Sequence, residues 1–374
     1  FAPYRRRGRR RAGGLRRGKG REGMGERIDV AVLGATGSVG QRFVQLLDGH
    51  PWFRVAELVG SERSAGQRYG DVCDWRLSDA PPREAAEMRV QHFEEPVRSS
   101  VVFSALPGGI AGEVEASLAA EGKRVFTNAR DHRMDPDVPL MIPEVNADHV
   151  AAIQAQRERR GWKDGFIVTN PNCSTIHLVL ALKPLWDAFG IEQAMVTTLQ
   201  AASGAGYPGV PSMDLIDNVV PFIGGEEEKI ETETKKLLGR YGPDGFRYAD
   251  LAISATCTRV PVRDGHTEAV SLKLGRKASV EEVIEVLSSY RGRPQELGLP
   301  SAPERPIVVR TENDRPQPIL DRNVERGMAS VVGRVRPCNV FDIRFVVLGH
   351  NTIRGAAGAS ILNAELLRVE GYLD

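Results

Sequence analysis

The sequence predicts an α/β protein whose N-terminal part forms a parallel sheet and whose second part is an α+β domain with a mostly antiparallel sheet. Strand-like and helix-like runs alternate up to about residue 130. After residue 170 the pattern changes to long strand-like runs. The length of 374 residues is typical of a protein with two domains.

The first alternating unit begins at residues 27–34, "RIDVAVLG", a short apolar run with β-branched residues that is typical of a buried strand. A helix is expected next, because apolar side chains recur at helical spacing at Val39, Phe43, Val44 and Leu47. Further strands are expected at 53–60, 100–106 and 123–129, with a helix over 109–122. Such alternation predicts a parallel sheet.

The second part contains five strand-like runs, at 192–204, 251–262, 266–275, 328–337 and 339–349. Strict alternation within the third run predicts a strand with one buried face, typical of an antiparallel sheet. Helices are expected at 225–239 and 279–292, and one long helix at 352–371. Residues 292–326, rich in Pro, Arg and Glu, read as a loop.

Charge is concentrated at the N-terminus. Residues 1–23 hold ten Lys or Arg against one acid, a net +9 where the whole chain carries +1. This composition predicts a disordered basic arm over residues 1–26. Translation from upstream of Met24, a solvated arm without a specific role, and an arm that binds nucleic acid or another anion are its three possible explanations. A secretory signal is not expected, because no apolar segment follows the arginines.

The rest of the composition indicates a soluble cytoplasmic protein. No apolar run approaches the length of a membrane-spanning helix. The four cysteines, at 73, 173, 257 and 338, lie far apart, so neither a metal site nor a disulfide framework is expected.

A glycine-rich turn, "GATGSVG", connects the first strand to the first helix. Gly34, Gly37 and Gly40 give a G-x-x-G-x-x-G spacing. Glycines permit a tight turn and close backbone approach, and a helix N-terminus offers N–H groups to a pyrophosphate. The flanking strand and helix favour a Rossmann-type dinucleotide site over an ordinary tight turn.

The end of the second strand favours NADP over NAD. Folds that bind NAD usually place an acid there for the ribose hydroxyls. Here the strand runs into "VGSERSAGQ", in which Ser61, Arg63 and Ser64 suit a 2′-phosphate, and Glu62 would oppose one only if it pointed inward. A polar surface loop is the alternative.

Cys173 lies where a buried strand meets an amphipathic helix, in "NPNCST". A thiolate there would be stabilised by the helix dipole and by free N–H groups. Such a thiolate can add to a carbonyl and hold a thioester while hydride is exchanged with a nicotinamide. Asn170 and Asn172 are suitable capping residues beside it. A buried structural cysteine is the alternative.

A nucleophile of this kind needs a base and substrate contacts. His266 opens a strand after a turn and can reach a cleft, whereas His177, inside the Cys173 helix, is expected to be packed. Arg259 could bind a carboxylate through two parallel hydrogen bonds, or could be a surface residue of its strand. Gln200 precedes the loop "AASGAGYPG", which is flexible enough to close over a ligand.

Together these stretches resemble the aspartate-β-semialdehyde dehydrogenase family, in the branch typical of archaea and fungi. The resemblance runs from about residue 28 to the C-terminus and includes "VAVLGATGSVGQRF", "NPNCST", "LQAASGAGYPGV", "PFIGGEEEKIETET" and "RVPVRDGHTEAVSLKL". It implies an NADP-binding domain over 27–169 and 350–374, and a catalytic and dimerisation domain over 170–349. It also implies a homodimer or homotetramer.

The resemblance further implies a role for each matching residue. Cys173 would be the nucleophile, His266 the general acid/base, and Gln200 the residue that orients the intermediate. Substrate contacts would come from Arg259, Glu226, Lys229 and Asn172, although three consecutive glutamates leave the register at Glu226 open. Cofactor contacts would come from Gly34, Thr36, Gly37, Ser38, Val39, Gly40, Ser61, Arg63, Ser64, Ser104, Leu106 and Asn351.

The implied reaction is the NADPH-dependent reductive dephosphorylation of L-aspartyl 4-phosphate to aspartate 4-semialdehyde, on the route to lysine, threonine and methionine. Malonyl-CoA reductase, which uses the same cysteine chemistry, is the nearest alternative. An acid at Glu226 separates the two, because only an amino-acid substrate has an ammonium group to pair with it. N-acetyl-glutamyl-phosphate reductase, and a nucleic-acid-binding protein that uses the arginine arm, are further alternatives.

Overall fold

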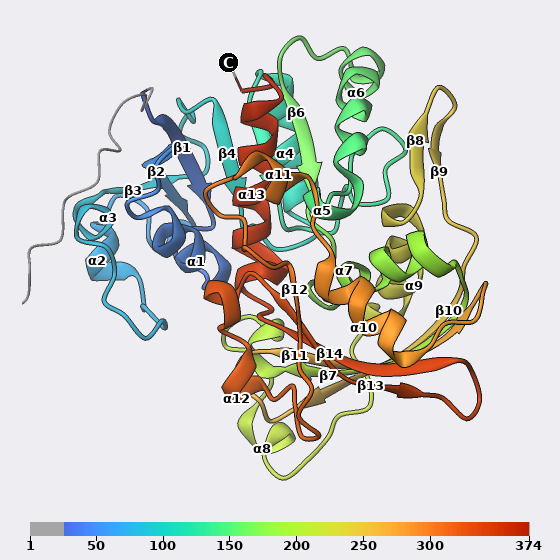
Figure 1. The fold of residues 1–374 in the computed structure, drawn as a ribbon. Helices are drawn as coiled ribbons and strands as arrows, with labels where there is room; N and C mark the ends of the chain where they lie inside the picture. The colour runs from blue at the N-terminus through green and yellow to red at the C-terminus, as the bar shows by residue number, and fades with distance from the viewer. Residues whose placement is uncertain (1–25, 374) are drawn as a thin grey trace, which may run out of the picture.

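The computed structural model of the chain describes residues 26–373 (Figure 1). The basic arm expected at residues 1–26 therefore lies outside the described residues, apart from Glu26. The described residues form one parallel sheet, one mixed sheet and a two-stranded hairpin. This confirms the α/β class and both kinds of sheet that the sequence predicts.

The first sheet is parallel throughout, with the strand order β3-β2-β1-β4-β5-β6. The order reverses between β1 and β4, and ligands of such sheets bind at the carboxyl ends of the strands at this switch point. The strands are β1 Ile28–Leu33, β2 Phe53–Gly60, β3 Val90–His92, β4 Val101–Ser104, β5 Arg124–Thr127 and β6 Phe166–Thr169.

Helices cover both faces of this sheet, as parallel strands require. On one face, α1 (Ser38–Leu47) and the C-terminal α13 (Gly358–Val369) share an apolar core with β1, β4, β5 and β6. On the other face, α4 (Ala111–Ala120) packs against the same strands. Figure 1 shows α13, in red, beside this first sheet although it is the last helix of the chain.

Two glycines bring the start of α1 against the ends of β1 and β4. Gly34 has a φ of 68°, and a Cβ there would lie 2.8 Å from the carbonyl oxygen of Ala105. Gly40 lies inside α1, where a Cβ would collide with the carbonyl oxygen of Gly34. The turn therefore has the tight form that a bound pyrophosphate needs.

The second sheet has the order β10-β7-β11-β14-β13-β12. Its three central pairings are antiparallel, whereas β10 with β7 and β12 with β13 are parallel. Burial alternates along β11, as the sequence predicts. The strands are β7 Ile191–Ala201, β10 Ala252–Val260, β11 His266–Leu274, β12 Ile307–Val309, β13 Ser330–Pro337 and β14 Ile343–Gly349.

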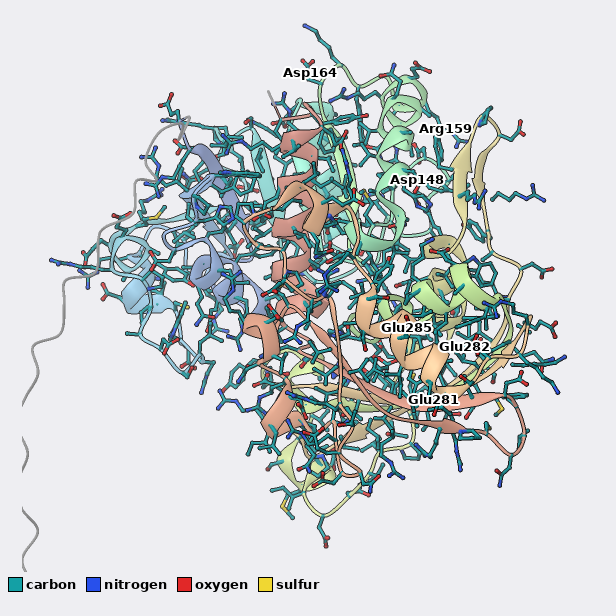
Figure 2. All side chains as sticks on the ribbon, viewed as in Figure 1. Asp148, Arg159, Asp164, Glu281, Glu282 and Glu285 are labelled. Carbon is teal, nitrogen blue, oxygen red and sulfur yellow. The ribbon has the colours of Figure 1, made fainter. Side chains whose placement is uncertain are left out.

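Three helices cover the inner face of the second sheet, namely α7 (Cys173–Phe189), α9 (Glu226–Leu237) and α10 (Val280–Ser289). The amphipathic α10 buries Val283 and Leu287 and turns an acidic side outward, where Figure 2 shows Glu281, Glu282 and Glu285. The opposite face of the sheet is open, and every second side chain in the middle of β7 is exposed there.

The shorter elements complete the described chain. The hairpin consists of β8 Arg240–Gly242 and β9 Gly245–Arg247. The remaining α-helices are α2 Tyr69–Val72, α3 Arg83–Glu87, α5 Pro143–Asn146, α6 Ala152–Arg160, α8 Ser212–Leu215, α11 Arg293–Leu297 and α12 Pro318–Asp321. The 3₁₀ turns are η1 Ala147–Ala151, η2 Ala202–Ala205 and η3 Val324–Gly327. Within residues 26–373, no helix has both the length and the apolar character needed to cross a bilayer.

Two sequence expectations are wrong in detail. Residues 292–326 are not only loop, because they contain α11, β12 and α12, and β12 pairs with β13 at the sheet edge. The last helix is not α-helical throughout, because residues 353–357 form a π-helical turn, η4 (Ile353–Ala357), that runs directly into α13. That turn packs on the start of α7: a Cβ at Gly355 would lie 2.9 Å from the Cβ of Cys173.

Candidate active site

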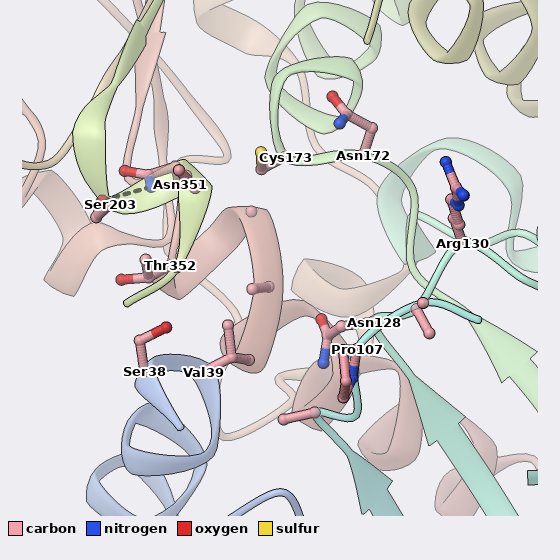
Figure 3. A pocket seen from close by; sticks show the side chains of 18 of the residues that line it. Ser38, Val39, Pro107, Asn128, Arg130, Asn172, Cys173, Ser203, Asn351 and Thr352 are labelled. Carbon is pink, nitrogen blue, oxygen red and sulfur yellow. Dashed lines mark hydrogen bonds between the residues drawn. The ribbon is translucent and has the colours of Figure 1, made fainter. Parts of the chain in front are cut away.

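A cavity of about 490 Å³ lies where the carboxyl ends of the parallel strands meet the start of α7 (Figure 3). Its lining comes from the start of α1, the segments after β4 and β5, the start of α7, the turn after β7, the start of α9, and the segment after β14. The cavity is therefore at the switch point where a ligand is expected. Ser38 and Val39 on α1 and Cys173 on α7 all line it.

The structure places Cys173 at the first residue of α7, directly after the N-cap residue Asn172. The Asn172 Oδ1 accepts hydrogen bonds from the N–H groups of Ser174, at 2.9 Å, and Thr175, at 3.3 Å. The strand-to-helix corner thus places Cys173 at the cavity, where Figure 3 shows it beside Asn172.

His266, the first residue of β11, contacts this cysteine. Its Nε2 lies 3.2 Å from the Cys173 Sγ. Its Nδ1 accepts a hydrogen bond from the Ala201 N–H at 3.0 Å. Because Nδ1 is an acceptor, neutral His266 carries its proton on Nε2, facing the sulfur. Burial and the nearby Arg259 lower the pKa of His266 to about 3, so the neutral form is present at neutral pH.

The Cys173 thiol is not activated in the way that the sequence suggests. Burial, with Glu226 adding to it, raises its pKa to about 12. Two of the N–H groups at the start of α7 are used by the Asn172 cap and are not free for a thiolate. The opposing, pKa-lowering effect comes from cations, with Arg133 first, then Arg259 and Lys229. The expectation of a thiolate stabilised by free helix N–H groups is therefore corrected.

Glu226 is the acid that faces the cavity. It accepts hydrogen bonds from Lys229 Nζ at 2.6 Å, Asn172 Nδ2 at 2.7 Å and Gln200 Nε2 at 3.2 Å. Burial opposes ionisation, but Lys229 and the other donors hold the pKa of Glu226 below its ordinary value. Of the three consecutive glutamates, Glu226 is the one that lines the cavity, whereas Glu227 accepts the Cys257 N–H and Glu228 is exposed.

Gln200, Arg259 and His266 are not among the residues that line the cavity, and Arg259 and His266 lie behind the turn that contains Gly204. Arg259 donates from Nη1 to the Ala201 carbonyl at 2.8 Å. A Cβ at Gly204 would lie 2.7 Å from that guanidinium and 2.9 Å from the His266 ring. The turn therefore covers Arg259 and His266, and only a glycine at position 204 leaves space for both.

The residues expected to hold a cofactor fall into two groups. Ser38, Val39, Leu106 and Asn351 line the cavity, where the Asn351 Nδ2 donates to the Ser203 Oγ at 2.8 Å. Gly34, Thr36, Gly37 and Gly40 form the glycine turn. Ser61, Arg63, Ser64 and Ser104 are not among the residues that line the cavity. Ser104 is fully buried. Ser61 and Arg63 are exposed after β2, whereas Ser64 is buried and its hydroxyl donates to the Ser61 carbonyl at 3.1 Å.

The glycine turn fits a dinucleotide. A Cβ at Gly34 would fill the space beside the Ala105 carbonyl. Gly37, the residue before α1, has no side chain to cap the helix. The first N–H groups of α1 are therefore open to an anion.

Sequence reasoning missed three cavity residues that follow β5, namely Asn128, Arg130 and Arg133. The rule that ligands bind beyond the carboxyl ends of parallel strands could have identified the segment. Cys257 is fully buried and His177 hydrogen-bonds the Ser330 hydroxyl at 2.8 Å, so both have packed positions. Among residues 26–373, His, Cys, Asp and Glu side chains form no cluster of three that could hold a metal ion.

Comparison with known proteins supports the resemblance seen in the sequence. Residues 29–153 match a family model described as the NAD-binding domain of semialdehyde dehydrogenase, and residues 182–354 match its dimerisation domain. The aspartate-semialdehyde dehydrogenase of Methanothermobacter thermautotrophicus is 54% identical over 91% of this chain and 99% of its own length. That of Schizosaccharomyces pombe is 48% identical over 92% of this chain and 99% of its own length.

Solved structures agree. A crystal structure of aspartate-semialdehyde dehydrogenase with NADP from Candida albicans is 43% identical and matches with a TM-score of 0.85, over 92% of this chain and 99% of that one. The Vibrio cholerae aspartate-semialdehyde dehydrogenase II, complexed with ASA, is 28% identical with a TM-score of 0.74, over 93% of this chain and 100% of that one. This chain therefore belongs to the aspartate-semialdehyde dehydrogenase family.

Proposed function

We propose that this chain catalyses the NADPH-dependent reductive dephosphorylation of L-aspartyl 4-phosphate to aspartate 4-semialdehyde through an acyl-enzyme on Cys173. The observation that carries the proposal is the contact of 3.2 Å between the Cys173 Sγ and the His266 Nε2. Cys173 lines a cavity whose wall also includes the start of helix α1, after the glycine turn, and an ionised carboxylate, Glu226.

The chemistry begins with attack of the Cys173 sulfur on the acyl carbon. A carbon–sulfur bond forms, the bond to the phosphate oxygen breaks, and the thiol proton leaves with the phosphate. Arg130, Arg133 and Lys229 also line the cavity, and they supply positive charge for the leaving phosphate. When bound, NADPH supplies the hydride that converts the thioester to the aldehyde. The His266 Nε2–H faces the sulfur and stabilises, through its hydrogen bond, the thiolate that is released as the product departs, and this thiolate takes up a proton from water.

Recognition of the amino acid is assigned to the opposite charges around Glu226 and Arg259. The Glu226 carboxylate is ionised and pairs with the substrate ammonium, and Gln200 beside it orients the acyl group. Arg259 binds the substrate carboxylate once the turn at Gly204 shifts. Asn172 holds Glu226 in place through its amide, in addition to capping α7.

The cofactor is NADP, and its pyrophosphate is assigned to the turn of residues 34–40. Ser61 and Arg63 are exposed after β2 and supply a hydroxyl and a cation for the 2′-phosphate. Leu106 and Asn351, which line the cavity, are assigned to the nicotinamide end.

The chain is further proposed to act as a homo-oligomer whose second domain forms the subunit contact. Every second residue in the middle of β7 faces outward, and Met195 and Leu199 are 55% and 38% exposed there. Met213, Ile216 and Phe222, after the same strand, are also exposed. Apolar exposure of this size on central strands is typical of a covered face. A second copy of the chain would bury these side chains.

The domain division expected from the sequence is kept as part of the proposal, with 27–169 and 350–374 as the NADP-binding domain and 170–349 as the catalytic and dimerisation domain. It is supported by α13, which shares its core with β1 and β4 although it follows β14 in the chain. A cytoplasmic location is proposed because four free thiols, one of them at the active site, suit a reducing compartment.

The test is phosphate-dependent reduction of NADP with aspartate semialdehyde, measured beside NADPH oxidation with malonyl-CoA. We expect activity with the semialdehyde and none with malonyl-CoA, because Glu226 faces the cavity and needs an ammonium partner. A protein that is inactive with the semialdehyde but oxidises NADPH with malonyl-CoA would refute the substrate assignment.

A further inference from the structure

Helix α9 carries a line of charged residues that does not end at the active site. Glu226, Lys229, Glu233 and Lys236 are spaced by three and four residues, so they share one face of the helix. The first two line the cavity. Glu233 and Lys236 do not, yet they are 2% and 0% exposed. An ionised group that is buried this deeply needs hydrogen-bonded partners, so the partners of Glu233 and Lys236 indicate what these residues do.

Glu233 uses both carboxylate oxygens on groups at the active site. Its Oε2 accepts the backbone N–H of Asn172 at 2.6 Å, which is the residue directly before the nucleophile. Its Oε1 accepts from the Arg133 Nη1 at 2.9 Å. One side chain therefore ties the start of α7 to a cavity-lining cation.

The side chain and the backbone of Arg133 are held by different residues of α9. Glu233 holds the guanidinium, whose Nη2 also donates to the Asn128 carbonyl at 2.7 Å. Lys236 holds the backbone, because its ammonium donates to the carbonyls of residues 133, 135 and 138 at 2.7–2.9 Å. A change at Glu233 should therefore release the guanidinium while the segment after β5 keeps its place.

We propose that Glu233 is a positioning residue for the phosphate end of the substrate, because it fixes the Arg133 guanidinium at the cavity and the backbone that precedes Cys173. The inference rests on the proposed function, in which Arg133 faces the leaving phosphate. Its signature is selective: the site for phosphate is disturbed, while the groups that hold the amino acid, Glu226 and Arg259, keep their contacts.

The experiment measures separate KM values for phosphate, aspartate semialdehyde and NADP in the phosphate-dependent direction. For Glu233→Gln, which keeps an acceptor oxygen but loses the charge that pairs with Arg133, we expect the KM for phosphate to rise about tenfold. The other two KM values should stay within about twofold. A residue with only a structural role would reduce the active fraction without changing one KM selectively.

Glu231→Gln is the matched control, because Glu231 lies on the same helix and accepts a backbone N–H, that of Ala255 at 3.0 Å, away from the cavity. It removes the same negative charge from the same helix, and all three KM values should match the wild type. Should Glu233→Gln fail to fold, Glu233→Asp, which keeps the charge but shortens the reach, must show the same selective rise.

A double-mutant cycle tests whether Glu233 acts through Arg133. In an Arg133→Met background, Glu233→Gln should change the phosphate KM no further. An unchanged phosphate KM in the folded Glu233 variants, or an equal rise in all three KM values, overturns the inference. A wild type without phosphate-dependent activity would instead refute the proposed function, so the two failures are distinguishable.

Discussion

Two helices begin at the same cavity, and only one of them has a side-chain cap at its N-terminus. Helix α1 starts after Gly37, which has no side chain to satisfy the first N–H groups. Helix α7 starts after Asn172, whose Oδ1 accepts from the N–H groups of Ser174 and Thr175. The positive end of α1 is therefore open to a ligand, whereas the positive end of α7 is occupied by its own chain.

The difference separates two tasks that a helix start can perform. An open start binds an anion, and the α1 turn has the glycines that let a pyrophosphate approach. A capped start holds a side chain rigidly, and α7 does this for Cys173. The charge that favours a thiolate must then come from elsewhere, and Arg133, Arg259 and Lys229 are the groups that lower the Cys173 pKa.

The largest expected effect is at the residue that the capped helix presents. Cys173→Ala should reduce phosphate-dependent NADP reduction by at least about 10³-fold, because no other group can form the acyl-enzyme. The melting temperature should change little, since the removed atom borders a cavity. Cys338→Ser, at a half-buried thiol outside the lining of the cavity, is the control and should keep full activity. Full turnover in Cys173→Ala would refute the mechanism.

The second prediction concerns the ionisation of that thiol. With its pKa raised to about 12, Cys173 is protonated at neutral pH in the ligand-free protein. Its alkylation by iodoacetamide should therefore accelerate about tenfold per pH unit, or about 10³-fold from pH 7 to 10, as the thiolate fraction grows. Mass spectrometry of the peptide that contains Cys173 measures the rate. A plateau near pH 8 would mean that the start of α7 does stabilise a thiolate.

The surroundings of Cys173 show which features of the site can be predicted from the sequence and which cannot. A cysteine between a buried strand and a helix predicts the corner, because local spacing determines it. The capping residue is also visible beside it. What spacing does not show is that the Asn172 amide is used at both ends, toward α7 and toward Glu226, since Glu226 arrives from a helix more than fifty residues later.

The same limit explains the other differences. Arg133 lies in a stretch without periodicity, and it becomes a cavity residue only because the segment after β5 meets α7. The π turn at 353–357 has nearly the spacing of an α-helix, so the pattern predicts one helix. Its cause is tertiary, because Gly355 packs against Cys173. Most strands of both sheets, in contrast, follow from local apolar patterns that predict them within a few residues, but the short edge strands β3 and β12 do not.

The third prediction closes the open helix. Gly37 has ordinary extended backbone angles, with φ −75° and ψ 167°, so Gly37→Asp can cap α1 with its carboxylate. The new negative charge would occupy the place of the pyrophosphate, and we expect the KM for NADP to rise about 10²-fold. The melting temperature should not fall, because the cap stabilises the helix. Gly37→Ala adds bulk without charge, and an equally large rise there would contradict the electrostatic explanation.

The smallest effect is expected from removing the N-cap of helix α7. Asn172→Ala removes the cap of α7 and one donor to Glu226, so the free energy of unfolding should fall by about 1–2 kcal/mol. The KM for the semialdehyde should rise only a few-fold, because Lys229 and Gln200 still hold Glu226. Asn172→Ser separates the two roles, since a hydroxyl oxygen can cap α7 but is too short to reach the carboxylate. For Asn172→Ser, chemical denaturation should therefore show near wild-type stability, and semialdehyde kinetics should show the same raised KM as in Asn172→Ala. A Ser variant as unstable as the Ala variant would show that the contact of the amide with Glu226, rather than the cap, holds the start of α7.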